Sequence, residues 1–367
     1  MARSLSRSRA ARVALTSTVA LAAGLTLAAC GSDEPAPGGA ETGASEAPAS
    51  GTVTIVAHDS FSLADGQLDE FTARTGIQVE VVQPGDAGTL VNQLVLTKDA
   101  PLGDLAFGID NTFASRVVDE GVVVPYSSAV PAAADAAQHA FGDGNELTAI
   151  DYGDVCLNVD HAWFDEHGVA EPVTLDDLTE PEYKDLLVVP NAVTSSPGFA
   201  FLLTTIAAQG DGWQDYWSAL KDNGLKVAEG WSDAYFTDFS GGGGGGPRPI
   251  VLSYASSPPY TVPEGGTEPT TGALLDTCFR QVEYAGVLAH AKNPRGAQEL
   301  LDFLLSDEVQ EQIPTTMYMY PVSTTVDLPA DWAQWAPLAE QPYEVDPVEV
   351  AENRAQWLED WSETVIG

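Results

Sequence analysis

Basic residues are scarce in this sequence. Lysine and arginine together number 15 against 54 aspartates and glutamates, which gives a formal net charge of -39 at pH 7. Because proteins that bind nucleic acid need clustered lysine and arginine to neutralise phosphates, the shortage excludes nucleic acid as a partner. The excess of carboxylates favours cationic ligands, but it also serves solubility, and acidity alone does not separate these two roles.

Motifs of catalysis and metal binding are also lacking. The chain has no nucleophile elbow, no Walker loop, no HExxH motif and only five histidines. His161 and His167 lie six residues apart, a spacing that does not put both on one face of a helix, so we favour a solvated helix over a metal site. We therefore expect a protein without metal or cofactor that is not an enzyme.

Long hydrophobic runs are missing except near the start of the chain. Four arginines precede a run from Val13 to Ala29, and the sequence then continues into Cys30. A basic stretch, a short apolar core and small residues before the cut indicate an export signal, too short for a membrane span of about 20 residues. Leu27-Ala28-Ala29-Cys30 resembles a bacterial lipobox, which predicts that Cys30 is lipidated and anchors the chain on the outer face of the membrane. The alternative is an ordinary signal peptide with an incidental cysteine.

The segment after Cys30 has almost no apolar residues. Residues 31–50 are mainly Gly, Ser, Ala, Pro and acidic residues, a composition that predicts a disordered tether. We assign residues 1–29 to the signal peptide and residues 30–50 to the lipidated cysteine and tether. About 315 residues remain, a length that suits two lobes of roughly 150 residues each.

Cysteine is rare, with three in the whole chain. Once Cys30 is assigned to lipid, Cys156 and Cys278 remain as an even pair in an oxidising compartment. A disulfide is then the favoured interpretation, and two buried free thiols are the alternative.

Strand-like and helix-like segments alternate along the chain, which predicts an α/β fold with parallel βαβ units. We expect strands at 53–56, 77–82, 105–109, 147–159, 186–189, 250–254 and 279–289. We expect helices at 63–76, 89–97, 161–167, 199–209, 213–220, 231–236 and 294–311, followed by a last helix that carries Trp357 and Trp361.

Two extended segments, near residues 150 and 282, link two regions of the chain. They predict lobe I from residues 51–149 and 284–367, lobe II from residues 150–283, and a ligand cleft between the hinged lobes. Polar turns follow the first three strands, where ligands of open α/β sheets bind. Serine followed by proline at Ser196 and Ser257 predicts two helix starts, whose N–H groups can hold an anion.

Two further patterns have ordinary explanations. The six glycines at 241–246 satisfy GxGxxG trivially and do not lie between a strand and a helix, so they predict a flexible loop. Tyr318 and Tyr320 alternate as iron-binding tyrosines on a strand would, but a packed aromatic edge is the favoured interpretation.

Several short strings occur in a characteristic order. They are Asp59-Ser60-Phe61, Gly108-Ile109-Asp110-Asn111, Asp151-Tyr152-Gly153, Thr194-Ser195-Ser196-Pro197-Gly198, Gly230-Trp231-Ser232-Asp233-Ala234-Tyr235, Leu252-Ser253-Tyr254-Ala255-Ser256-Ser257-Pro258 and Tyr318-Met319-Tyr320-Pro321-Val322. Through these strings, nearly the whole chain after residue 51 resembles the thiamine-binding proteins of bacterial thiamine ABC transporters.

The resemblance implies a two-lobed periplasmic-binding fold, type II-like, that holds thiamine or a thiamine phosphate between its lobes. Positions that match ligand contacts of the family are Asp86, Ala87, Ser195, Ser196, Trp231, Tyr254, Ala255, Ser256, Ser257 and Tyr260. Further candidates are His58, Asp59, Asp110, Asn111 and Tyr235. Aromatic faces attract the thiazolium cation, and a carboxylate such as Asp86 can offset its charge.

The chain departs from the family at two places. His58 stands where the family commonly has tyrosine, which predicts weaker stacking and greater sensitivity to pH. The glycine run lengthens one connection, which predicts a looser cleft wall.

The predicted function is that of a monomeric substrate-binding lipoprotein that passes its ligand to ABC permease subunits. The alternatives are a binding protein for another cationic solute, such as a polyamine or ferric ion, or an enzyme of thiamine salvage. The enzyme would need a nucleophilic cysteine, Cys156 or Cys278, in the cleft.

Overall fold

The computed structural model describes residues 50–367, which fall within one compact unit, Pro48–Gly367. The predicted signal peptide, the lipidation site Cys30 and the tether up to residue 49 lie outside the described residues. Among the described residues, no helix combines the length and the apolar character needed to cross a bilayer.

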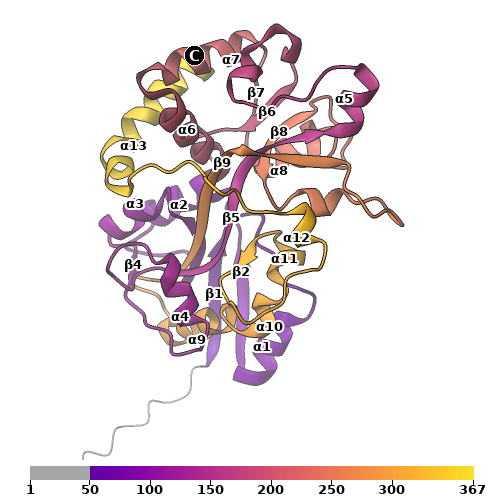
Figure 1. Ribbon diagram of the computed structural model, residues 1–367. Coiled ribbons are helices and arrows are strands. Elements are labelled where there is room, and N and C mark those ends of the chain that lie inside the picture. The colour runs from indigo at the N-terminus through magenta and orange to yellow at the C-terminus, as the bar shows by residue number, and fades with distance from the viewer. Residues whose placement is uncertain (1–49) are drawn as a thin grey trace, which may run out of the picture. The chain divides into compact units, whose positions relative to one another are not determined.

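One mixed sheet of ten strands forms the centre of the described residues (Figure 1). Its main order is β2-β1-β3-β9-β5-β8-β6-β7, with β10 beside β5 and β4 beside β9. The strands are β1 (Gly51–Ala57), β2 (Ile77–Val82), β3 (Leu105–Asp110), β4 (Val123–Val124), β5 (Thr148–Asp160), β6 (Leu187–Pro190), β7 (Lys226–Ala228), β8 (Ile250–Tyr254), β9 (Thr271–Leu288) and β10 (Tyr320–Pro321).

Helices cover the sheet. They are α1 (Gln67–Thr75), α2 (Ala87–Leu96), α3 (Ala114–Asp119), α4 (Ala133–Ala136), α5 (His161–His167), α6 (Ser196–Gln209), α7 (Trp213–Asp222), α8 (Trp231–Asp233), α9 (Pro294–Leu304), α10 (Asp307–Gln310), α11 (Ile313–Thr316), α12 (Trp332–Trp335) and α13 (Pro347–Trp361). Short turns used below are the π-helical η5 (Ala234–Asp238), the 3-10 helix η6 (Pro258–Thr261) and the π-helical η7 (Ser362–Ile366).

The first βαβ unit forms as predicted. β1 pairs in parallel with both β2 and β3, and the buried side of β1 packs under the helices. The first helix is shorter than the expected 63–76, because Gly66 has a φ of 88°, a left-handed conformation that starts the helix at Gln67. The sheet is mixed rather than purely parallel, since β9 runs antiparallel to β3 and β5.

Two long strands connect the two halves of the sheet. β5 and β9 pair antiparallel with each other and run through the middle of the fold (Figure 1). β1, β2 and β3 lie on one side of this pair, and β6, β7 and β8 lie on the other. We call these groups, with the helices that pack on them, the first half and the second half.

The C-terminal helix contacts both halves. α13 packs on α3 of the first half and on α7 of the second half. The Arg354 guanidinium lies 4.3 Å from the ring centroid of Phe113, next to α3, and 5.2 Å from that of Phe199 on α6. Trp361 meets Trp217 of α7 edge to face, with 5.6 Å between centroids. The chain end is therefore part of the core that joins the halves.

Two expected helices are broken. The 294–311 segment divides into α9 and α10, because Ser306 is extended, with ψ 148°, and begins the second helix. The 231–236 segment starts as α8 and continues as the π-helical η5 to Asp238. The final helix is present as predicted, and it carries Trp357 and Trp361.

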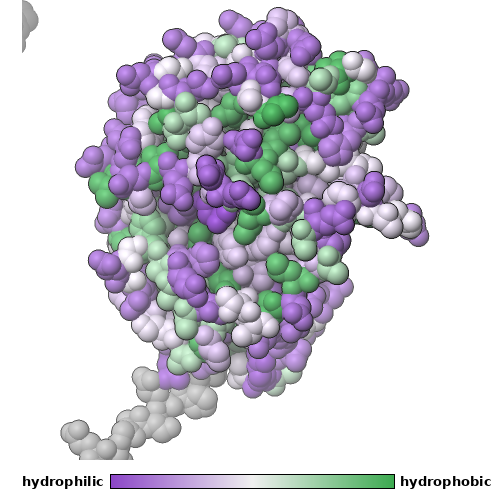
Figure 2. Space-filling model, in the orientation of Figure 1, coloured by the Kyte–Doolittle hydropathy of each residue, from purple (hydrophilic) through white to green (hydrophobic). Residues whose placement is uncertain are grey.

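Hydrophilic and apolar residues are distributed unevenly over the face of the molecule in Figure 2. Figure 2 shows hydrophilic residues around the margins of one face, with apolar residues in small areas of its upper centre. The apolar mass lies inside, where one cluster of buried side chains extends from Val53 to Val365 and includes Trp217 and Trp361, each fully buried.

Candidate ligand-binding site

A cavity of about 300 Å³ lies where the carboxyl ends of β1 and β2 face α8, η5 and β9. Its lining residues come from both halves of the fold and from the connecting strand β9. They are His58, Asp59, Ser60, Asp86, Ala87, Ser196, Pro197, Trp231, Ser232, Tyr235, Phe236, Tyr254, Ser257, Tyr260, Gln281, Glu283, Thr316, Met317, Tyr318 and Met319. Such a cavity at strand ends is the expected place for a ligand in an open α/β sheet.

Asp86 links the two halves at the cavity wall. It precedes α2, and its Oδ1 accepts a 2.6 Å hydrogen bond from the N–H of Ala87. Its Oδ2 accepts a 2.9 Å bond from the N–H of Trp231, which belongs to the second half. Burial raises the pKa of Asp86, while the bond from Trp231 acts in the opposite direction. The side chain thus places a carboxyl group at the cavity and fixes the start of the helix that carries Trp231.

Aromatic side chains form a second part of the cavity wall, which begins beside Asp86 at Trp231. Trp231 stacks on Tyr235 with 5.1 Å between ring centroids, and its Nε1 donates a 3.0 Å bond to Ser253 Oγ. Tyr254 meets Trp231 edge to face at 6.3 Å. Tyr260, which is 47% exposed, meets Tyr318 edge to face at 5.4 Å. This wall offers flat faces to a planar or cationic ligand.

A chain of hydrogen bonds runs from the aromatic wall to β3. The hydroxyl of Tyr254 donates to Gln281 Oε1 at 2.9 Å, and Gln281 Nε2 donates to Ser196 Oγ at 2.9 Å. Ser196 in turn donates to Asp110 Oδ2. Asp110 Oδ1 accepts three bonds from Thr112 and Phe113, so this carboxylate holds the turn after β3.

The buried position of Asp110 predicts a pH effect on stability. Burial raises its pKa from 3.8 to about 6. Between these values the folded protein binds more protons than the unfolded chain, so Asp110 lowers the free energy of unfolding as pH rises from 4 to 6. We therefore expect Asp110→Asn to be stabilised relative to the parent protein as the pH rises. Between pH 4 and pH 6 the difference in the free energy of unfolding should grow by roughly 3 kcal/mol. Urea unfolding at pH 4 to 7 measures the difference, and one that does not change with pH would contradict this assignment.

A buried charge cluster forms the floor of the cavity. His58 Nε2 lies 3.6 Å from Glu283 Oε1. Burial acts to lower the pKa of His58, but the Glu283 carboxylate outweighs it and the pKa is raised. Burial acts to raise the pKa of Glu283, yet the charge of His58 leaves it lowered. Burial and the nearby Glu283 charge raise the pKa of Asp151 well above its ordinary value. The floor therefore pairs the His58 imidazole with the Glu283 carboxylate, and Asp151 lies close enough to Glu283 for the two carboxyl groups to interact.

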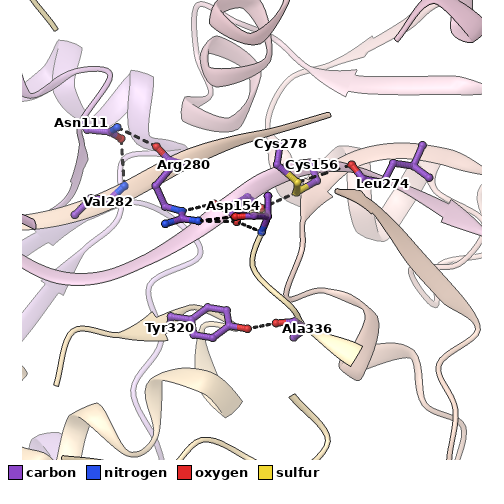
Figure 3. Close-up of polar contacts among 10 residues, drawn as sticks. Asn111, Asp154, Cys156, Leu274, Cys278, Arg280, Val282, Tyr320 and Ala336 are labelled. Atoms are coloured by element: carbon purple, nitrogen blue, oxygen red, sulfur yellow. Dashed lines mark hydrogen bonds and ion pairs between the residues drawn. A yellow bond between two sulfur atoms is a disulfide. The ribbon is translucent and has the colours of Figure 1, made fainter. Parts of the chain in front are cut away.

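Behind the cavity, the connecting strands are fastened to each other (Figure 3). Alternate residues of β9 point to opposite faces, so Gln281 and Glu283 face the cavity while Arg280 pairs with Asp154 of β5. The side chain of Asn111 is bonded to the backbone of β9 on both sides of Gln281. Its Nδ2 donates to Arg280 O at 3.0 Å, and its Oδ1 accepts from Val282 N at 3.2 Å.

A disulfide between Cys156 and Cys278 joins β5 to β9, as the sequence predicts. It lies beside an irregularity in the pairing of the two strands, between Val155 and Leu157. Both sulfurs are consumed in this bond, so neither cysteine is available as a nucleophile. An enzyme of thiamine salvage would need one of these cysteines as a free nucleophile, so the structure does not support that alternative.

The glycine run differs from the expected loose loop. A Cβ at Gly242 would lie 1.9 Å from Tyr235 O, and one at Gly244 would lie 1.7 Å from Phe236 O, so these residues pack directly on the backbone of η5. Gly243 and Gly245 have φ values of 86° and 68° and face open space. Close contact and left-handed backbone thus alternate, and the run supports the wall that carries Tyr235 instead of loosening it.

This alternation predicts different costs for neighbouring substitutions. Gly244→Ala forces its Cβ onto a carbonyl oxygen and should lower the free energy of unfolding by about 3 kcal/mol. Gly243→Ala meets no atom within 4 Å and should cost only the left-handed strain, about 1 kcal/mol. Urea unfolding of both variants compares them, and equal costs would refute the packing argument.

The structure brings most of the predicted ligand residues to the cavity. Those that line it are Asp86, Ala87, Ser196, Trp231, Tyr254, Ser257 and Tyr260, with His58, Asp59 and Tyr235 from the further candidates. Ser195, Ala255 and Ser256 lie among the buried residues outside the lining. Asp110 and Asn111 also lie outside it, and they act through the hydrogen bonds described above.

The predicted serines differ in what their hydroxyls do. Ser195 takes the N-cap position of α6 without a side-chain capping bond, and its buried hydroxyl acts to lower the pKa of Asp86. Ser256 donates to Tyr318 O, and Ser257 exchanges a 2.8 Å bond with Ser253. The second Ser-Pro string starts only the short η6, which begins at Pro258.

Sequence reasoning missed several cavity residues. Gln281 and Glu283 lie in a segment that was expected only to be extended, although two polar residues at alternate positions of an apolar strand indicate a functional face. Thr316 and Met317 belong to no recognisable motif, and Met319 lies in the string from Tyr318 to Val322 but was not expected to contact a ligand. Tyr318 has a φ of 56° and lies outside β10, so it does not share a strand face with Tyr320. Tyr320 packs on Trp332 with 4.9 Å between centroids, in keeping with the packed edge.

The two histidines of α5 contact different partners. His161 Nδ1 lies 2.5 Å from Glu171 Oε1, and His167 stacks on Trp163 with 3.9 Å between ring centroids. Within residues 50–367, no three His, Cys, Asp or Glu side chains form a group suited to a metal ion.

Comparison with known proteins agrees with this architecture. The chain is 29% identical over 320 residues to the thiamine-binding periplasmic protein of Escherichia coli K12, covering 85% of this chain and 93% of that protein. A solved periplasmic thiamin binding protein superposes with a TM-score of 0.74 at 27% identity, covering 86% of this chain and 96% of that one. Iron-bound HitA from Pseudomonas aeruginosa, at 19% identity and a TM-score of 0.66, shares the fold over 85% of this chain and 99% of its own.

The fold is thus the two-lobed α/β fold of periplasmic binding proteins, with two connecting strands and a ligand cleft. A family model described as bacterial extracellular solute-binding protein matches residues 100–339, more than half of the chain, and the chain belongs to that family. It is an extracytoplasmic solute-binding protein of an ABC importer, and it is not an enzyme.

Proposed function

We propose that the protein captures thiamine or a thiamine phosphate in the cavity and delivers it to the permease subunits of an ABC importer. The observation that carries this proposal is the pairing of an aromatic wall with a carboxylate floor. Trp231, Tyr254 and Tyr260 face a space bounded by Asp86 and Glu283. Thiamine has a flat aminopyrimidine and a permanently cationic thiazolium, which suit these two surfaces. The similarity to proteins named as thiamine-binding supports the same ligand.

The proposed roles follow from the contacts of each residue. Asp86 already accepts two backbone bonds, so it contributes charge and holds Trp231 in place. The indole of Trp231 is itself held by Ser253, which prepares its face for stacking. Ser196 and Ser257 place hydroxyls in the lining, where they can bond to polar atoms of the ligand. His58, in the place of a tyrosine, balances Glu283 instead of supplying a large aromatic face.

We further propose that residues 51–149 with 284–367, and residues 150–283, act as lobes that close on the ligand about β5 and β9. Closure by a ligand requires that it contact both lobes. Asp86 and Trp231 come from different halves and meet at the cavity, so a ligand between them satisfies this requirement. The contact of α13 with α7 brings the last part of the chain against the second lobe.

We propose that Cys30 carries a lipid that anchors the protein as a monomer on the outer face of the membrane. The lipobox-like string before Cys30 supports this. Cys30→Ser should move the protein from the membrane fraction to the soluble fraction after cell breakage. If the variant remains membrane-bound to the same extent, the anchor lies elsewhere.

Calorimetric titration of the full chain in a non-ionic detergent tests the ligand assignment. We expect one-to-one binding of thiamine, or of one of its phosphates, with a submicromolar dissociation constant. Spermidine and chelated ferric ion, titrated in the same way, test the other solutes on this fold. No heat with any thiamine form, at full native circular dichroism, would refute the proposal, and binding of spermidine or iron would replace it.

A further inference from the structure

Three carboxyl side chains form a row across adjacent strands in the middle of the sheet. Glu283 on β9 is opposite Asp110 on β3 at one side and opposite Asp151 on β5 at the other. Residues directly opposite each other on neighbouring antiparallel strands point to the same face, with Cβ atoms about 5 Å apart. All three residues are buried, with exposed fractions of 0% for both aspartates and 5% for Glu283. Three negative charges in such a buried row would repel one another strongly.

The two aspartates differ in the donors that reach them. Asp110 accepts the hydrogen bonds of the turn after β3 and that of Ser196, and these donors stabilise its ionised form. In contrast, no N–H or hydroxyl group within residues 50–367 donates to either oxygen of Asp151. The Asp151 carboxyl group is instead within hydrogen-bonding reach of the Glu283 carboxyl group. Ionised carboxylates only accept hydrogen bonds, so two carboxyl groups can bond to each other only when one of them carries a proton.

We propose that Asp151 and Glu283 share one proton, and that this proton holds β5 to β9 at the floor of the cavity in a way that depends on pH. The two side chains come from the two connecting strands, so the shared proton adds a bond where the lobes are proposed to turn. Loss of the proton leaves two like charges opposite each other, which destabilises the pairing of the strands. The Nε2 of His58 faces Glu283 at 3.6 Å and supports the one negative charge that remains. The other titratable groups around this cluster are Asp59 after β1, Asp86 before α2, Asp110 on β3 and Tyr254 on β8.

The shared proton predicts how stability changes with pH. Burial and the Glu283 carboxylate raise the pKa of Asp151 well above its ordinary value. Above about pH 4 the folded protein therefore keeps a proton that the unfolded chain has released, and stability falls with rising pH until the folded pair releases it too. Asp151→Asn keeps a similar size and an N–H donor for Glu283, but it has no proton to lose. The ratio of its folding constant to that of the parent should rise by up to about tenfold for each pH unit in this range.

Urea unfolding of the full chain from about pH 5 to about pH 8 measures this ratio. Asp110 titrates in both proteins, so its own effect largely cancels from the comparison. Asp165→Asn on α5 is the matched control, since it makes the same change at an exposed residue. Its unfolding midpoint should differ from that of the parent by an amount that does not vary with pH.

Infrared spectroscopy in D₂O observes the proton directly. A protonated carboxyl group has a C=O stretch that is separate from the amide band and from the bands of ionised carboxylates. We expect this stretch in the difference spectrum between the parent and Asp151→Asn near neutral pH. In Glu283→Gln the same stretch should disappear at a lower pH than in the parent, because the charge that helps to hold the proton on Asp151 is gone.

The outcomes separate sharing from simple burial. If the stretch is absent from the difference spectrum and the ratio of folding constants does not vary with pH, the pair holds no proton and the proposal is overturned. If the stretch is present but disappears at the same pH in Glu283→Gln, burial alone keeps Asp151 protonated and the sharing is overturned. Should Asp151→Asn fail to fold by circular dichroism, the comparison of the parent with Glu283→Gln still decides. These measurements need no ligand, so their failure is distinct from a failure to bind thiamine.

Discussion

Trp231→Ala should weaken thiamine binding about 100-fold, the largest effect that we expect from any single cavity substitution. The indole lines the cavity, stacks on Tyr235 and is held by the 3.0 Å bond from its Nε1 to Ser253. A side chain fixed in advance loses little conformational freedom when the ligand binds, so removing it costs nearly all of its contact energy. Calorimetric titration with thiamine measures the loss directly.

Two further variants separate stacking from general disturbance. Trp231→Phe keeps an aromatic face but not the bond to Ser253, and it should lose about tenfold. Trp163→Ala removes a half-buried tryptophan from α5, outside the lining, and should leave the affinity unchanged. A Trp231→Ala protein whose dissociation constant stays within threefold of the parent would show that the ligand does not stack on this wall.

Removing the disulfide should have the largest effect on stability. Cys156 and Cys278 are separated by 122 residues, so their bond closes a long loop and restricts the unfolded chain strongly. The loop-entropy relation gives about 5 kcal/mol for a loop of this length, and measured losses for native disulfides are typically about 2 to 5 kcal/mol. We expect the double variant Cys156→Ala, Cys278→Ala to unfold at a clearly lower denaturant concentration.

The bond itself can be distinguished from the packing of its sulfurs. Dithiothreitol should destabilise the parent protein by a similar amount and leave the double alanine variant unchanged. If dithiothreitol shifts both proteins equally, or neither, the disulfide does not carry the stabilisation. Thiamine affinity provides a second measurement, because the bond lies between the two strands on which the lobes are proposed to turn.

The sequence was sufficient where local pattern and tertiary structure agree. β1, β2 and β3 alternate with helices, and their parallel pairing followed from that pattern. Asp86 and Trp231 came from the resemblance and do lie together at the cavity, although 145 residues separate them. No periodicity in the sequence could have brought these two residues together.

The sequence was insufficient where the role of a residue depends on its neighbours in space. Glu283 lies on a strand that looked merely extended, and it becomes a cavity residue only because β9 passes the end of β1, where His58 lies. Asp110 looked like a ligand residue at a strand end, but the turn that follows it and Ser196 take up its oxygen atoms. The glycine run looked flexible because composition does not show that a carbonyl oxygen lies within 2 Å of a missing side chain.

The course of the chain end has a mechanical consequence. In addition to β5 and β9, the segment before α13 is a third stretch of chain that runs through the region between the two halves. Ala339 N donates to Asp154 at 2.7 Å, and Tyr343 N donates to Cys278 O at 2.7 Å, so this segment is bonded to both connecting strands. Two bodies joined by two adjacent strands can twist as well as open, whereas a third connection that ends in a helix packed on both bodies opposes the twist. Any opening of the cavity must also turn Phe113 and Phe199 about the guanidinium of Arg354. If the lobes close about β5 and β9 as proposed, the last segment of the chain, remote from the cavity in sequence, sets the stiffness of that movement.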